Sequence, residues 1–85
     1  MKKSITRTQT GLRLETRLIK VLKGLAEHLD VSLAELVEGM ALHAFEGKVV
    51  FSQETRDKIL KLKEVYDLDL SAADSHMTQE RTDQT

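Results

Sequence analysis

The sequence predicts a mostly α-helical chain with one short β-strand near its N-terminus. Three observations support this prediction: apolar residues alternate over 9–14, apolar residues recur at helical spacing in three later stretches, and serines stand where helices would begin. The polar stretch 68–85 predicts a disordered tail. The expected organisation is a flexible basic arm over 1–8, a strand and two helices over 9–47, a connector with a third helix over 48–67, and the tail.

The strand is predicted from the sequence Gln-Thr-Gly-Leu-Arg-Leu at 9–14. Because strand side chains alternate between two faces, one face would carry Thr10, Leu12 and Leu14 and the other Gln9, Gly11 and Arg13. A lone strand leaves its backbone groups unpaired, and no later stretch reads as a second strand of similar strength. We therefore expect it to pair with the same strand of a second copy.

The first two helices are predicted over 16–29 and 33–46. Thr16 is the expected N-cap of the first. Ser32 and Glu35 have capping-box spacing at the start of the second, and Gly47 would end it. The apolar stripes are Leu18, Val21, Leu22, Leu25 and Leu29 in the first helix and Leu33, Leu36, Val37, Met40, Ala41 and Ala44 in the second.

Glycine inside the second helix needs an explanation, because it costs about 1 kcal/mol relative to alanine. We expect the backbone of a partner's helix to approach closely at Gly39; the alternative is a glycine that is merely tolerated. The third helix is predicted over 53–67, with Ser52 as its cap and Ile59, Leu62 and Tyr66 on one face.

Length and composition favour an oligomer. A core of about 40 residues buries too little apolar surface to offset chain entropy without disulfides, metals or oligomerisation. The 85 residues include no cysteine, and three histidines without ligand spacing predict no metal site. No stretch is long and apolar enough for a membrane span, so we expect a cytoplasmic protein. No catalytic motif or glycine-rich phosphate loop occurs, which argues against an enzyme and against a cofactor.

Charge is distributed unevenly along the chain. Residues 1–23 contain seven basic side chains and one acidic one, a net charge of +6, whereas residues 24–85 carry a net charge of -7. Such an asymmetry indicates an N-terminal surface for a polyanion. The alternative is a charged face that is only solvated.

Strand, helix, short turn and helix within about 38 residues, with a basic outer face on the strand, resemble the ribbon-helix-helix DNA-binding proteins of the Arc and MetJ type. The resemblance rests on Leu12-Arg13-Leu14, the stripe from Leu18 to Leu29, and Val31-Ser32-Leu33-Ala34-Glu35, and it covers residues 9–47. It implies an intertwined homodimer whose two strands form an antiparallel ribbon in the major groove of double-stranded DNA.

The resemblance also implies site residues. Base contacts would come from Gln9, Gly11 and Arg13, with Arg13 as the main reader of guanine. Phosphate contacts would come from the side chains of Lys2, Lys3 and Arg7 and from backbone N–H groups at Ser32, Leu33 and Ala34. The dimer core would contain Leu12, Leu14, Leu18, Leu22, Leu25, Leu36, Val37, Gly39 and Met40.

Three positions depart from the family pattern. Gly11 replaces a polar reader, Asp30 replaces a turn glycine, and Ala34 replaces a frequent serine. The predicted function is a homodimeric transcriptional regulator that acts as a repressor. Two alternatives stay open: an antitoxin or interaction module that binds a toxin or other protein through 48–85, and a dimerisation domain that has lost DNA reading.

Overall fold

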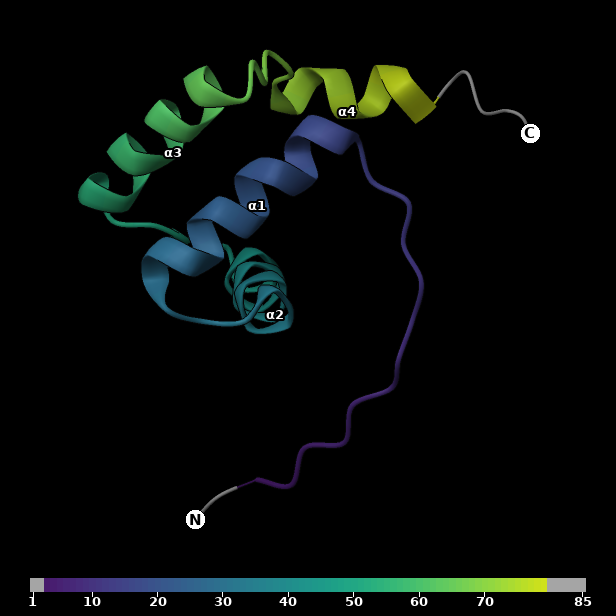
Figure 1. The fold of residues 1–85 in the computed structure, drawn as a ribbon. Coiled ribbons are helices and arrows are strands. Elements are labelled where there is room, and N and C mark those ends of the chain that lie inside the picture. The colour runs from purple at the N-terminus through teal and green to yellow at the C-terminus, as the bar shows by residue number, and fades with distance from the viewer. Residues whose placement is uncertain (1–2, 80–85) are drawn as a thin grey trace.

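The computed structural model describes residues 3–79, and the side chains of residues 3–75. This part of the chain contains helices α1 (Thr16–Leu29), α2 (Leu33–Phe45), α3 (Gln53–Val65) and α4 (Ala72–Gln79). Helix α1 lies between α2 and α3 and packs against both (Figure 1). The first three helices agree with the predicted ranges to within two residues at either end.

The core is built on the apolar stripe of α1. Leu25 is the most buried residue, with 2% of its surface exposed, and Leu22 and Ala26 are buried beside it. Helix α2 adds Leu36, and α3 adds the partly buried Ile59 and Leu62. Because two helices cover one stripe, α1 fixes where both α2 and α3 can pack. Phe51 in the connector before α3 also packs against this core.

Side-chain caps mark the helix starts. At α2 the predicted capping box is confirmed: the Ser32 hydroxyl accepts from the Glu35 N–H at 3.0 Å, and the Glu35 carboxylate accepts from the Ser32 N–H at 2.9 Å. Ser52 caps α3 by accepting from the Thr55 N–H. Helix α1 differs from the prediction, because its N-cap is Glu15 and not Thr16.

Helices α1, α2 and α3 end in the same kind of turn. A left-handed residue follows each helix, at Asp30, Gly47 and Asp67, with φ of 60°, 68° and 56°. The next N–H then bonds back to a carbonyl five residues earlier, as in the pair Leu68 and Lys63 at 2.8 Å. This is the Schellman arrangement, which satisfies carbonyls that a helix end leaves without partners. Asp30 can occupy this position because aspartate tolerates the left-handed conformation.

The predicted strand is wrong: residues 3–79 contain no β-strand, and residues 3–14 are irregular and exposed. This segment extends outside the helical core (Figure 1), and the radius of gyration of 14.6 Å exceeds the roughly 12 Å of a compact chain of this length. The physical reason is that an isolated strand has no ladder to satisfy its backbone groups, which water solvates here instead. The fold class is therefore corrected to all-helical, without a ribbon.

The C-terminal stretch also differs from the prediction. Helix α4 occupies Ala72–Gln79, inside the range 68–85 expected to be disordered. Its start is stabilised by Asp74, whose carboxylate accepts from the Ser71 N–H at 2.7 Å. Ser71 and Asp74 have the serine-x-x-acid spacing that often precedes a helix. This spacing predicts a helix start, whereas the polar composition of the whole stretch had predicted disorder. Residues 80–85 of the predicted tail lie outside the described residues.

Within one chain, close packing at a glycine occurs in α1. A Cβ atom on Gly24 would lie 3.1 Å from the Leu62 Cδ2 atom, so the missing side chain lets α3 approach α1. A Cβ atom on Gly39 would meet nothing within 4 Å in this chain. Gly24 is therefore the glycine on which the packing of one chain depends.

We expect Gly24→Leu to lower the free energy of unfolding by about 1–3 kcal/mol, because the new side chain would push Leu62 and α3 away from α1. Chemical denaturation followed by circular dichroism measures this change. Gly11→Leu is the matched control, since Gly11 has no neighbouring atom within 4 Å and lies outside the helices. Equal losses of stability in the two variants would contradict the assigned role of Gly24.

Candidate nucleic-acid interface

The exposed N-terminal residues 3–14, called the basic segment below, carry the predicted DNA-contacting side chains. Gln9, Gly11 and Arg13 are all exposed. No hydrogen bond or ion pair engages Lys3 or Arg13 anywhere in residues 3–79. Lys2, another predicted phosphate contact, lies outside the described residues. The guanidinium of Arg13 therefore keeps all its donors available for a ligand.

Arg7 behaves differently, because it is bound to α2. Its Nε donates to Glu38 Oε2 at 2.9 Å and its Nη2 donates to Glu38 Oε1 at 3.0 Å. The hydrogen bond and the charge of Glu38 raise the pKa of Arg7, and Arg7 in turn lowers the pKa of Glu38. Sequence patterns do not predict this pair, since the two residues are 31 positions apart. It brings the basic segment to the first half of α2.

The start of α2 retains two unpaired backbone donors. The capping box uses the N–H groups of Ser32 and Glu35, so Ser32 does not offer the free N–H that was predicted. The N–H groups of Leu33 and Ala34 have no acceptor in the described chain. Free N–H groups at the positive end of a helix dipole attract anions, although the Glu35 carboxylate reduces the positive potential there.

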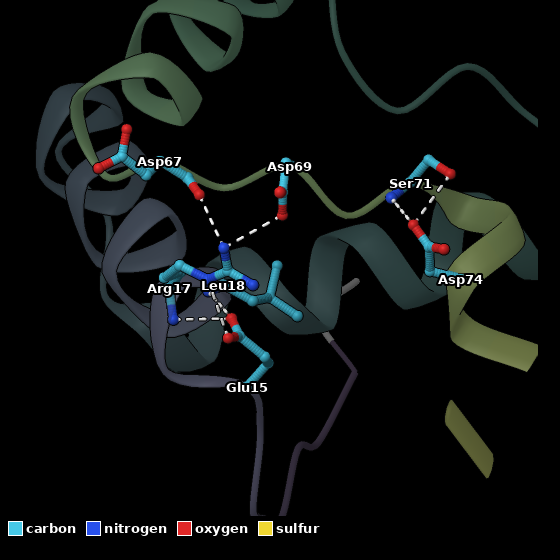
Figure 2. Close-up of polar contacts among 7 residues, drawn as sticks. All are labelled: Glu15, Arg17, Leu18, Asp67, Asp69, Ser71 and Asp74. Atoms are coloured by element: carbon cyan, nitrogen blue, oxygen red, sulfur yellow. Dashed lines mark hydrogen bonds and ion pairs between the residues drawn. The ribbon is translucent and has the colours of Figure 1, made fainter. Parts of the chain in front are cut away.

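Arg17 joins the start of α1 to the segment before α4 (Figure 2). Its Nε donates to Glu15 Oε2 at 3.0 Å, while its Nη1 donates to the Asp67 carbonyl at 2.9 Å and to Asp69 Oδ1 at 3.1 Å. The same Glu15 carboxylate caps α1 by accepting from the Arg17 and Leu18 N–H groups. Arg17 is therefore paired within the chain, although the charge pattern had placed it among the residues expected to bind a polyanion.

Internal pairing reduces the basic N-terminal charge without removing it. Arg7 and Arg17 are paired within the chain, whereas Lys3, Arg13 and the α1 residues Lys20 and Lys23 are exposed and have no acidic partner among residues 3–79. Four cations therefore remain for an external anion. They lie on the basic segment and on the solvent side of α1.

The residues predicted for a dimer core divide into two groups. Leu22, Leu25 and Leu36 are buried inside the single chain, and Met40 packs against them. The others form no part of that core: 69% of the surface of Leu12 is exposed, and the exposed group also contains Leu14, Leu18 and Val37. Gly39 and Met40 line an open groove of about 280 Å³ between α2 and the connector before α3.

Comparison of the chain with protein-family models, curated proteins and solved structures gave no match. In the described residues, no group of three or more potential metal-ligating side chains comes together. Across the same residues, none of the helices is both long enough and apolar enough to cross a membrane. A nucleic-acid interface is therefore inferred from the charges, hydrogen-bond donors and apolar surface of this chain alone.

We expect the two glutamate caps to make stability fall in acid. The Leu18 N–H chiefly lowers the pKa of Glu15, and the Ser32 N–H chiefly lowers that of Glu35, below the ordinary value of 4.5. A lowered pKa in the folded state means that the stabilisation is present above pH 4.5 and is lost as the pH falls through the lowered pKa.

Thermal unfolding between pH 6 and pH 3 tests this expectation. The double variant Glu15→Gln/Glu35→Gln should lose less stability over that range than the wild type. Glu27→Gln is the control, because Glu27 is an exposed residue in the last turn of α1 and its carboxylate caps no helix. A double variant with the same acid dependence as the wild type would show that the caps do not cause it.

Proposed function

We propose that the chain is a homodimeric, cytoplasmic DNA-binding regulator of transcription that acts as a repressor. The observation that carries this proposal is the solvent-exposed basic segment, whose Lys3 and Arg13 have no partner within the described chain. The Arg7–Glu38 pair places this segment against α2, whose N-terminus offers two further donors. Backbone donors and flexible cations near one another are the groups that bind DNA phosphates.

Sequence reading is assigned to Arg13. Arginine binds guanine O6 and N7 through two parallel hydrogen bonds, and the major groove presents these atoms at its edge. Gln9 suits adenine in the same way, and Gly11 between them lets the backbone approach the bases. Because the segment is irregular in the free chain, we expect it to become ordered on DNA.

The dimer is supported by the apolar surface that one chain leaves in water. Leu14, Leu18, Leu33 and Val37 are exposed although they belong to the alternating segment or to the helical stripes. The chain buries only a small core of its own, and small domains with neither disulfides nor metals are commonly stabilised by association. Covering these side chains with a second copy would enlarge the core.

A second candidate function is binding of another protein, such as a toxin, through 48–85. The observation that favours it is apolar exposure in this range: Val49, Leu60 and Val65 expose 78%, 60% and 68% of their surfaces. These residues lie on the connector and on α3, away from the basic segment. The two functions are compatible, since a DNA-binding dimer can use its C-terminal half for a protein partner.

We expect Arg13→Ala to weaken binding to a duplex selected from random DNA by about 1–3 kcal/mol at physiological salt, because one bidentate base contact is lost. Fluorescence anisotropy measures the affinity. Arg56→Ala is the control: Arg56 is an exposed arginine of α3, outside the proposed interface. If Arg13→Ala bound the duplex as tightly as the wild type, the basic segment would not be the part of the protein that reads the DNA sequence.

We expect Gly39→Leu to weaken the dimer without unfolding the chain. A Cβ atom at residue 39 would meet nothing within 4 Å in one chain, so a variant that keeps its helices but dimerises more weakly has lost contacts with a second copy. Sedimentation equilibrium measures the dimer dissociation constant, and circular dichroism of the dilute protein shows whether the helices persist. A variant dimer as stable as the wild type would exclude close approach of a partner helix at Gly39.

A further inference from the structure

The Arg7–Glu38 ion pair is the one hydrogen-bonded connection between the basic segment and the helices in the described part of the chain. The geometry is bidentate, with both Glu38 oxygens engaged by the Nε edge of the guanidinium. Glu38 projects from the second turn of α2, one turn after Glu35, whose charge also acts on Arg7. The Glu38 carboxylate therefore holds the arginine beside the first half of α2, and the charge of Glu35 adds to the attraction.

A carboxylate is a good mimic of a phosphate for this purpose. The planar fork of arginine donates two parallel hydrogen bonds to two oxygens, and carboxylate and phosphate groups both present such oxygen pairs. A DNA phosphate that used the same edge of Arg7 would need the Nε and Nη2 donors that Glu38 occupies. The two acceptors therefore compete for the same edge of one side chain.

We propose that Glu38 competes with DNA for Arg7. In the free protein the Arg7–Glu38 ion pair, called the latch below, holds the basic segment to α2, and a DNA phosphate replaces Glu38 as the acceptor of Arg7 when DNA binds. This inference rests on the proposed DNA-binding function. It assigns a specific regulatory contact, because the segment then binds DNA only at the expense of the ion pair. Once the ion pair is broken, Arg7 no longer neutralises the negative charge of Glu38, and this charge also repels the DNA phosphates.

The expected size of the effect is modest. The two side chains are about half exposed, and an exposed ion pair of this kind changes an equilibrium by about twofold to fivefold. A latch of that strength lowers the apparent affinity by a similar factor, because only the unlatched fraction can offer Arg7 to a phosphate. It also weakens as salt rises, since exposed pairs are screened.

A double-mutant cycle on DNA affinity tests the competition. Glu38→Gln retains the shape of the side chain and removes its charge, and we expect it to raise the affinity for a short labelled duplex about twofold to fivefold in the wild-type background. In an Arg7→Gln background the same change should have a clearly smaller effect, since only general repulsion of DNA remains. Equal factors in both backgrounds, or a lower affinity of Glu38→Gln, would overturn the proposal.

Glu46→Gln provides the matched control. Glu46 follows α2, is exposed, and pairs with Lys48 at 3.4 Å instead of with the basic segment. Removing its charge should change DNA affinity by the same factor in both the wild-type and the Arg7→Gln backgrounds. Dependence of the Glu46→Gln effect on Arg7 would show that the cycle reports general electrostatics, and the proposal would then fail.

A measurement on the free protein separates this proposal from the proposed function. Heteronuclear NOE values for residues 5–9 report backbone order on the picosecond to nanosecond timescale, and Glu38→Gln should lower them while those of α3 stay unchanged. Unchanged values in the basic segment would overturn the latch whether or not DNA binds. If no variant bound DNA, the regulator and the competition would both be refuted, while a fall in the NOE values would still establish the contact.

Discussion

The structure depends on the burial of one apolar stripe on α1. Leu22, Leu25 and Ala26 are covered by Leu36 from α2 and by side chains of α3, so a single helix organises both neighbours. The absence of a side chain at Gly24 allows the α3 contact, with Leu62 lying where a larger residue would protrude. Because this core is small, little apolar surface remains to hold any segment that does not touch α1.

The basic segment is held to the helices by a charged side chain, and the residues before α4 are held by a charged side chain and by the burial of Leu68. Arg17 joins the start of α1 to the residues before α4, and Arg7 joins the basic segment to α2. Exposed ion pairs contribute little stability individually, so such links can be exchanged for others at small cost. In the proposed function, a link of this strength would let a DNA phosphate replace the internal acceptor of Arg7.

The two chemical surfaces of the chain suit two different partners. Among the basic side chains of residues 3–23, Lys3, Arg13, Lys20 and Lys23 form no ion pair with residues 3–79, and they lie on the basic segment and the solvent side of α1. The apolar side chains left in water, among them Leu18 and Val37, follow the stripes of α1 and α2. In the proposed function, a polyanion would bind the first surface and a second copy of the chain would cover the second.

The sequence by itself determined the features that arise from interactions within about five residues. The bounds of α1, the capping box at Ser32 and Glu35, and the left-handed turns at Asp30 and Gly47 all follow from local periodicity and capping. Tertiary structure alone decided that residues 9–14 are irregular, that α1 and α3 meet at Gly24, and that Arg7 and Arg17 pair with distant residues. Those features join residues 31 to 52 positions apart, or require a neighbouring strand, and sequence periodicity does not encode which distant groups meet.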